Sequence, residues 1–491
     1  MVDQFKLDKL KNLRKSGIDA YPYTFDRRNH AHEITSDFGR LEGKGVSVAG
    51  RIMGFRKMGG LYFLDLLDSS GRIQILVKRD SIDGKYLEII ELTDVGDVLG
   101  VEGKVIKTAR GEVSIEASEI TMLAKSLRTL PEKFHGLTDT EQRYRKRYLD
   151  LMVNPKIREF FVVRAKILRF MREFLDKRGY VEFETPVLQP IYGGAAAKPF
   201  VTRHNALDAD MFLRISDELY LKKLIVGGFE KVYEVSKDFR NEDIDSTHNP
   251  EFTQIEAYEA YKDYEGYMRM VEELLSGMVM QLFGSHRIRH QGRDIDFTPP
   301  FKRVYWVKEL EREVGVDVSA LDNRDAAKLA EKEGLEVAIK NNAHVADALF
   351  DKYIKPTLVN PTFVVDFPSY MCPLTKDKRG NDKLSERFEL YIAGFETMNC
   401  YSELTDPIEQ RKKFEEQERE RKRGDEEAPP SDEDFLEAVE FGMPPTAGIG
   451  MAIDRLSMIL TDNVSLKEVI AFPAMRPEKE AKAHDIRKRG K

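Results

Sequence analysis

The sequence is poor in cysteine and has no long apolar run. Its 491 residues include two cysteines, Cys372 and Cys400, too few for a disulfide framework or a four-thiolate metal site, which agrees with a reducing compartment. No stretch of about 18 apolar residues is present, so we expect neither a membrane-spanning helix nor a membrane partner. The charged, amphipathic start of the chain has no apolar core of a signal peptide. Together these absences predict a cytoplasmic protein.

A net positive charge is also missing. The formal charge of −7 at pH 7 is unusual for a protein that binds RNA, because contacts to phosphates need Lys and Arg. The basic residues are concentrated at the front, where residues 1–150 hold 26 Lys and Arg against 23 Asp and Glu. A solvated surface can produce an excess of this size, so charge alone does not decide whether the chain binds RNA.

The length and the patterning predict more than one domain. A chain of 491 residues is too long for one hydrophobic core. Residues 45–125 alternate apolar and polar positions between Gly and Asp residues, which predicts about five strands closed into a small barrel. We therefore place an N-terminal helix and barrel at residues 1–130, a linker rich in Arg and Tyr at 131–155, and a larger domain at 156–491.

One segment of the larger domain concentrates polar and aromatic groups. Residues 232–239 predict a strand, and a second strand follows the polar loop 241–250. In that second strand, period-two alternation puts four side chains on one face, namely Phe252, Gln254, Glu256 and Tyr258, and three on the other, namely Thr253, Ile255 and Ala257. Long loops on a rigid sheet are often functional. The residues alone fit the floor of an active site and a charged surface hairpin equally well.

The segment FRNEDIDSTHNPEFTQIE, residues 239–256, resembles motif 2 of the class II aminoacyl-tRNA synthetases in its lysyl-tRNA synthetase form. A helix predicted at 156–178, ended by Gly179 and followed by a predicted strand at 180–188, is similar to motif 1, and FGMPPTAGIGMAIDRLSMIL at 441–460 is similar to motif 3. The resemblance runs from about Val46 to Pro477. It implies an α+β protein with an N-terminal OB-fold barrel and a catalytic domain built on an antiparallel β-sheet flanked by helices. It also implies a homodimer formed through motif 1.

The family's activity is the activation of L-lysine by ATP and its transfer to tRNA(Lys). The resemblance implies an ATP site formed by Arg240, Glu242, His248, Phe252, Gly450 and Arg455. Arg240, His248 and Arg455 would be catalytic, because cations stabilise the charge that develops at the α-phosphate. Three small residues on one strand face, Gly448, Gly450 and Ala452, would leave room for a flat nucleotide.

A magnesium ion on ATP would be held by Glu389 and Glu396, which suits a hard cation that prefers oxygen ligands. Glu396 and Asn399 differ in strand parity, so a bulge or the turn at Gly394 must reorient one of them. Thr247 stands where many bacterial members carry Arg, which removes one cationic contact to phosphate.

The lysine-binding residues implied by the resemblance are Gly194, Glu218, Glu256, Tyr258, Asn399, Tyr401 and Glu403. Gly194 and Glu218 would hold the α-ammonium, and Glu403 with Tyr258 the ε-ammonium. Tyr401 would form the wall beside the aliphatic stem, and Asn399 would orient the α-carboxylate. Cys400 adds bulk beside this pocket, where Gly or Ala is usual.

In the barrel, the stretches VAGRI, LYFLDL and GRIQILV resemble the anticodon-binding OB-fold. Phe63 would stack on an anticodon base, and Arg51, Gln74 and Glu112 would read base edges or the backbone. From the sequence alone, Phe63 fits a core aromatic residue at least as well.

Three alternatives have to be weighed. An aspartyl- or asparaginyl-specific sibling shares the motifs, but it should present cations or amides to its substrate where this chain offers Glu403 and Tyr258. A paralogue that lysylates a protein would lack the anticodon barrel. A non-catalytic OB-fold RNA-binding protein would not need Arg240, Arg455 or the acidic pair, all of which are present.

Overall fold

The structure is a computed structural model that describes residues 2–131, 137, 139–337, 341–423 and 427–477. The chain divides into two compact units, Met1–Gly136 and Leu137–Lys491. Parts of the predicted linker, residues 132–136 and 138, lie outside the described residues. The rest of that linker is largely helical and belongs to the second unit, as α5 (Thr140–Arg145) and α6 (Arg147–Val153).

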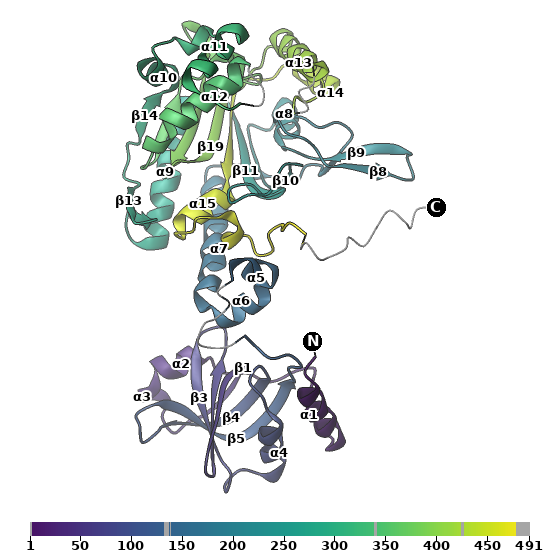
Figure 1. Ribbon diagram of the computed structural model, residues 1–491, viewed down its shortest axis with the longest axis vertical. Helices are drawn as coiled ribbons and strands as arrows, with labels where there is room; N and C mark the ends of the chain where they lie inside the picture. The colour runs from purple at the N-terminus through teal and green to yellow at the C-terminus, as the bar shows by residue number, and fades with distance from the viewer. Residues whose placement is uncertain (1, 132–136, 138, 338–340, 424–426, 478–491) are drawn as a thin grey trace. The chain divides into compact units, whose positions relative to one another are not determined.

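The first unit is a closed five-stranded barrel with the strand order β1-β2-β3-β5-β4 (Figure 1). Its strands are β1 (Gly45–Met58), β2 (Leu61–Leu67), β3 (Arg72–Lys78), β4 (Val98–Lys107) and β5 (Val113–Ala124). Its helices are α1 (Gln4–Lys15), α2 (Ala31–Ser36), α3 (Phe38–Leu41) and α4 (Gly84–Leu92). Only β3 and β5 pair in parallel. The predicted barrel and OB-fold are confirmed.

Alternation along the strands builds the interior of this barrel. In β2, Tyr62, Leu64 and Leu66 are fully buried, and the residues between them face outward. A Cβ on Gly103 would lie 2.1 Å from the carbonyl oxygen of Glu116, so only glycine lets β4 approach β5 this closely.

The second unit is built on an eight-stranded sheet with the order β14-β15-β18-β19-β20-β11-β10-β6. These strands are β6 (Val181–Glu182), β10 (Lys231–Phe239), β11 (Glu251–Ala260), β14 (Lys302–Tyr305), β15 (Thr362–Val365), β18 (Arg387–Ile392), β19 (Phe395–Ser402) and β20 (Thr446–Ala452). Neighbours from β15 to β10 are antiparallel, and both edge strands pair in parallel. The predicted antiparallel sheet is therefore right for its centre, and the sheet as a whole is mixed.

Short sheets complete the strands of this unit. They are formed by β7 (Leu188–Gln189), β8 (Val201–His204) and β9 (Ala209–Leu213), by β12 (Arg287–His290) and β13 (Arg293–Asp296), and by β16 (Asp377–Lys378) and β17 (Asn381–Ser385). The hairpin of β8 and β9 extends away from the main sheet (Figure 1).

Helices cover both faces of the main sheet. They are α7 (Pro155–Asp176), α8 (Glu218–Val226), α9 (Tyr264–Phe283), α10 (Trp306–Val314), α11 (Asn323–Glu333), α12 (Asn342–Tyr353), α13 (Pro407–Lys422), α14 (Glu433–Glu440), α15 (Ile453–Leu460) and α16 (Leu466–Val469). The largest apolar cluster joins α7, α9 and α15 to one face of the central strands. A second cluster joins α8, α13 and α14 to β10 and β11, and a third joins α10, α11 and α12 to β14 and β15.

Two predictions around motif 1 have different outcomes. The predicted helix is α7, and Gly179 follows it with a left-handed φ of +81°, as a C-terminal stop requires. The predicted strand at 180–188 is wrong, because only β6 and β7 form there, with two residues each. Pairing with β10 stops after two residues, and Pro186 cannot donate to a ladder. Among the described residues, no helix is long and apolar enough to cross a membrane.

Candidate active site

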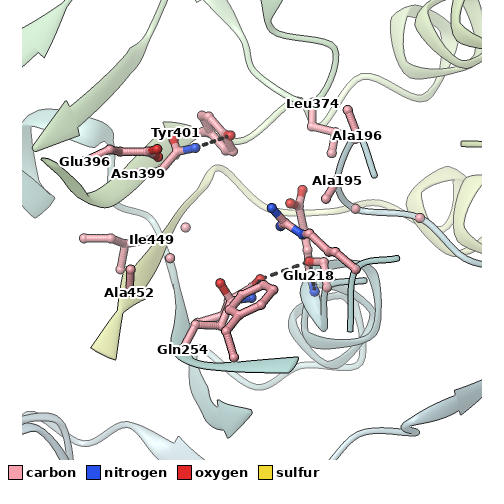
Figure 2. A pocket seen from close by; sticks show the side chains of 18 of the residues that line it. Ala195, Ala196, Glu218, Gln254, Leu374, Glu396, Asn399, Tyr401, Ile449 and Ala452 are labelled. Carbon is pink, nitrogen blue, oxygen red and sulfur yellow. Dashed lines mark hydrogen bonds between the residues drawn. The ribbon is translucent and has the colours of Figure 1, made fainter. Parts of the chain in front are cut away.

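A cavity of about 410 Å³ opens on the face of the sheet opposite α7 and α9, and its floor is formed by β11, β19 and β20. Figure 2 shows Glu396, Asn399 and Tyr401 along one side and Glu218 and Gln254 across from them. Strand alternation explains this polar floor, because the apolar residues of the same strands face the core on the other side.

The hairpin of β10 and β11 supplies much of the cavity. The register pairs Asp238 with Phe252 and Val232 with Tyr258, so the predicted partner strand is confirmed. Phe252, Gln254, Glu256 and Tyr258 all line the cavity as predicted, whereas Ile255 and Ala257 belong to the core. Thr253 of the opposite face also borders the cavity, although its hydroxyl accepts from Arg164 of α7.

Arg240 lies where β10 ends, and its guanidinium carbon is 5.0 Å from the ring centroid of Phe252. Its Nε is buried and has no hydrogen-bond partner in the part of the chain that the structure describes. A buried donor without a partner is costly, so an acceptor from a ligand would stabilise it. Arg240 can thus accept an anion beside an aromatic face that suits stacking.

The loop between these strands orients His248 toward the cavity. Nδ1 of His248 lies 2.8 Å from Oδ2 of Asp245, and the backbone N–H of His248 donates to Oδ1 at 2.8 Å. The Thr247 hydroxyl donates to the same carboxylate at 3.0 Å. Burial opposes a low pKa for Asp245, but the hydrogen bonds from His248 and Thr247 hold that pKa well below its usual range. Thr247 therefore supports the carboxylate that positions His248.

The β18–β19 hairpin turns at Ala393 and Gly394, both with positive φ. Its register shifts between Leu390 paired with Met398 and Tyr391 paired with Glu396, which leaves Thr397 as an extra residue. This bulge puts Glu396 and Asn399 on the same side of the cavity (Figure 2), so the predicted reorientation is confirmed.

Asn399 and Tyr401 form the rest of that side. Nδ2 of Asn399 donates to the Tyr401 hydroxyl at 2.8 Å, whereas Oδ1 of Asn399 is buried without a hydrogen-bond partner among the described residues. The guanidinium carbon of Arg387, a residue that sequence reasoning missed, lies 5.4 Å from the Tyr401 ring centroid.

Motif 3 places two glycines on β20 with different consequences. A Cβ on Gly450 would meet no atom of the described residues within 4 Å, so this glycine leaves open space above the strand. A Cβ on Gly448 would lie 2.2 Å from Cε1 of Tyr258 and 2.3 Å from Oε1 of Glu403. The prediction that both leave room for a nucleotide is wrong for Gly448, whose missing side chain admits Tyr258 and Glu403 instead.

Carboxylates gather at one part of the cavity wall. Gly194 has a φ of +84°, and a Cβ there would lie 2.9 Å from the Ser216 hydroxyl and 3.1 Å from Cβ of Glu218. Glu256 accepts from Ser216 at 3.0 Å and from the Tyr258 hydroxyl at 2.9 Å. Burial first, and then the charge of Glu218, raise the pKa of Glu256 to about 8.

Glu403 differs from the other predicted lysine-binding residues. It is 0% exposed, it does not line the cavity, and its Oε2 forms an ion pair with Lys222 on α8. Burial raises the pKa of Glu403, and Lys222 opposes this shift. Glu403 therefore lies behind the cavity wall, where Lys222 contacts it, and its role with Tyr258 at an ε-ammonium stays a prediction. The other six predicted residues all line the cavity.

The two residues predicted to hold magnesium are also unequal. Glu396 lines the cavity, and its Oε2 accepts from Nη1 of Arg455 at 3.2 Å. Glu389 lies outside the cavity wall, where Arg387 and Tyr391 donate to its two oxygens. Burial raises the pKa of Glu389 to about 7.

Another group of carboxylates brings oxygens within 4.8 Å of one another: Asp217, Asp238 and Glu256. Nε2 of Gln254 donates to Glu256 at 2.7 Å and also contacts Asp238. Protein donors therefore already occupy much of this group.

In the barrel unit, Arg51, Phe63 and Gln74 lie on strands β1, β2 and β3, and Glu112 lies in the loop before β5. Phe63 is half-buried between the inward Tyr62 and Leu64, which excludes the core-aromatic alternative. Gln74 lines a shallow cavity with Glu112, and this cavity also includes three charged residues that the prediction missed, namely Asp65, Arg72 and Arg110. Nη1 of Arg51 donates to the carbonyl of Gly96 at 2.6 Å, so at least part of its guanidinium has a structural contact.

Comparison with known proteins agrees with this geometry. Residues 139–476 match the family of tRNA synthetases class II (D, K and N), and residues 46–123 match the OB-fold nucleic acid binding domain. The lysine–tRNA ligase of Moorella thermoacetica is 46% identical over 97% of this chain and 98% of its own length. That of Carboxydothermus hydrogenoformans is 47% identical over 96% and 97%, respectively. The chain belongs to the lysine–tRNA ligases. The predicted family and fold class are confirmed.

For a lysine–tRNA ligase, the most informative residues that sequence reasoning missed are Lys222 and Asp245. The spacing of Glu218 and Lys222 on one helix was a usable signal, because residues four apart share a face. Asp245 lies three residues before His248, the spacing of a local side-chain turn.

Proposed function

We propose that this protein activates L-lysine with ATP, forming lysyl-adenylate and pyrophosphate, and then transfers the lysyl group to the 3′-terminal ribose of tRNA(Lys). One observation carries the proposal. A single cavity is lined by cationic side chains suited to phosphates, Arg240 and Arg455, and by carboxylates suited to ammonium groups, Glu218 and Glu256.

The first step needs no general base. The carboxylate of lysine is already an anion, attacks the α-phosphate in line, and the bond from the α-phosphorus to the bridging oxygen of pyrophosphate breaks. Arg240 would contact both the carboxylate and the α-phosphate, and its unpartnered Nε supports this role. His248 and Arg455 would stabilise charge on the outer phosphates.

The adenine would lie between Phe252 and the open surface above Gly450, and Glu242 would receive its amino group. The absence of any atom within 4 Å of a Cβ on Gly450 supports space for a flat ring there. Stacking on an aromatic ring holds a base through the buried area and the relative orientation of the two rings.

The lysine would be held by its two ammonium groups. Gly194 and Glu218 would take the α-ammonium, and Tyr258 and Glu403 the ε-ammonium, with Glu256 behind Tyr258. Arg240 and Asn399 would contact the α-carboxylate, and Tyr401 would lie beside the aliphatic stem. Oε1 of Glu403 is buried without a hydrogen-bond partner among the described residues, which supports its pairing with the ε-ammonium of the substrate.

We also propose that Glu396 and Glu389 hold magnesium, which when bound would neutralise charge on the phosphates. Carboxylate oxygens suit this ion. The fit is closer for Glu396, because the two oxygens of Glu389 already accept from Arg387 and Tyr391.

The barrel would bind the anticodon through stacking on Phe63 and polar contacts from Arg51, Gln74 and Glu112. The half-exposed ring of Phe63 on the outer barrel face supports this. A homodimer formed through α7 and a cytoplasmic location are part of the same proposal, the latter in keeping with two free buried cysteines.

An aspartyl- or asparaginyl-specific sibling and a non-catalytic RNA-binding protein are less well supported than the proposed ligase. A pocket rich in buried carboxylates would repel an aspartate side chain. The relatives that match over nearly the full length are lysine–tRNA ligases.

Charging of tRNA tests the proposal. Purified protein should form lysyl-tRNA from a tRNA(Lys) transcript only when ATP is present. Phe63→Ala should raise the KM for tRNA by about tenfold, as expected for loss of one stacked base, and leave ATP–pyrophosphate exchange unchanged. Phe5→Ala, which removes an exposed aromatic ring from α1, is the matched control. Charging of tRNA(Asp) or tRNA(Asn), or of none, would contradict the proposal.

A further inference from the structure

A buried lysine of the protein lies beside the pocket proposed for the substrate lysine. Lys222 on α8 is 0% exposed, and its Nζ is 2.5 Å from Oε1 of Glu218 and in contact with Oε2 of Glu403. The ammonium is also 5.9 Å from the ring centroid of Tyr258. One of the protein's own ammonium groups therefore meets the carboxylate that is proposed to receive the substrate's ε-ammonium.

Stability alone does not account for this arrangement. Burying an ammonium costs hydration free energy, and apolar residues of similar volume often stabilise a folded core as well or better. The two carboxylates share one ammonium, and this leaves the group of Glu218, Glu403 and Lys222 with one net negative charge when all three are ionised. Oε1 of Glu403 has no hydrogen-bond partner within the described residues, so it can accept from one more donor.

Lysine supplies the matching charge. Its α-ammonium and α-carboxylate cancel, and its side chain adds one positive charge. An amino acid with a neutral side chain of the same shape would leave the buried negative charge uncompensated, which is strongly unfavourable away from water.

We propose that Lys222 is a specificity-determining positioning residue, which holds the Glu218–Glu403 pair at one net negative charge so that these three side chains are neutralised only when a cationic side chain is bound. This inference rests on the proposed function and assigns to that pocket a residue that acts through Glu403 rather than by touching the reacting atoms.

The electrostatic surroundings support this role. Burial raises the pKa of Glu403, and Glu218 and Glu256 raise it further, whereas Lys222 lowers it. Without Lys222 the pKa of Glu403 would be higher still, which favours the protonated form, a hydrogen-bond donor where the ε-ammonium needs an acceptor. Among the described residues, the carboxylates that contact the ammonium are Glu218 of α8 and Glu403, which follows β19, and the Tyr258 ring of β11 lies beside it.

The test is ATP–pyrophosphate exchange by the full chain with Lys222→Met, a substitution of similar length and no charge. The KM for lysine should rise by about tenfold or more, while the KM for ATP stays within about twofold. Norleucine, which has the shape of lysine without the ε-ammonium, should gain relative to lysine in kcat/KM. Lys223→Met is the matched control, because Lys223 is the neighbouring residue of α8 and pairs with the exposed Asp434.

A second variant guards against poor folding of the first. Lys222→Met combined with Glu403→Gln removes the charges of both residues, so Glu403 is not left as an unpaired buried carboxylate. If Lys222 acts through Glu403, the double variant should have a KM for lysine within about threefold of Glu403→Gln alone, the mark of coupled residues. Additive losses in the double variant would overturn the inference. So would a KM for lysine that is unchanged in Lys222→Met, or one that rises only together with the KM for ATP.

Different results would contradict the proposed function and the role of Lys222. If the wild type does not exchange with lysine at all, the proposed function fails. If the wild type does so and Lys222→Met leaves the preference for lysine over norleucine unchanged, only the role of Lys222 fails.

Discussion

Nη1 of Arg455 donates to the carbonyl oxygen of Glu396 at 3.0 Å and to its Oε2 at 3.2 Å, although the two residues are 59 positions apart. Arg455 is proposed to contact phosphate and Glu396 to hold magnesium, so both would bind the same nucleotide with opposite charges. In the absence of a nucleotide they neutralise each other. Binding of magnesium and ATP would exchange this partly exposed pair for stronger charge-assisted contacts.

Glu396→Gln should therefore raise the magnesium concentration that gives half-maximal ATP–pyrophosphate exchange, by about tenfold or more, because one anionic oxygen donor is lost. The KM for lysine should not change. Titration of magnesium at saturating lysine measures this directly. Glu403→Gln serves as the comparison, since it should raise the KM for lysine and leave the magnesium requirement as it is. An unaltered magnesium requirement in Glu396→Gln would remove Glu396 from the proposed metal site.

Substitutions at the two glycines of β20 should each affect the KM of a different substrate. Gly448→Ala forces a methyl group against Tyr258 and Glu403, and displacing these groups should raise the KM for lysine by about tenfold or more. Gly450→Ala puts a methyl group into open space proposed for the nucleotide, so it should raise the KM for ATP instead. Steady-state kinetics with each substrate varied in turn checks both. The prediction fails if the two variants affect the same KM.

Stability should depend on pH through the buried carboxylate of Glu256. Its pKa of about 8 lies above the ordinary value for glutamate of about 4.3, so the contribution of this group to stability is full below the ordinary value and is lost as the pH rises toward 8. Glu256→Gln cannot ionise. The Tm of this variant relative to the wild type should therefore increase steadily between about pH 5 and pH 8.5. Thermal unfolding over this range without ligands measures the difference, and a constant difference would contradict the assignment.

Arg214 should matter more for stability than any surface arginine. It is 2% exposed and pairs with Glu234 at 2.7 Å and with Asp238 at 3.1 Å. Arg214→Met leaves both carboxylates buried without that cation, at a cost of about 3–5 kcal/mol. Arg172→Met, which breaks the more exposed pair with Glu182, should cost less than about 1 kcal/mol. Denaturant unfolding of the two variants gives the comparison, and equal losses would argue against the buried network.

Local patterns were sufficient to predict much of the fold and site. Period-two alternation predicted the cavity-facing side of β11, and parity required either a bulge or the turn at Gly394 to reorient Glu396 or Asn399. The structure has the bulge, at Thr397. These features depend on neighbouring residues of one hairpin. The barrel followed from the same alternation, because each strand shows its inward face in the sequence.

Features that join distant segments could not be predicted. Lys222 and Glu403 are 181 positions apart, and nothing in either local sequence indicates that they pair. The crowding of Gly448 by Tyr258 likewise depends on the pairing of β20 with β11. The short β6 was overestimated, because a strand-like segment does not show how many of its residues find a partner strand.

The central claim is the activation of lysine through a carboxylate pocket, and ATP–pyrophosphate exchange tests it most directly. The purified protein is offered each proteinogenic amino acid in turn, wild type beside Glu403→Gln. The account predicts exchange with lysine alone in the wild type and a KM for lysine that is raised by about tenfold or more in the variant. Exchange with aspartate or asparagine, or with no amino acid, would contradict it.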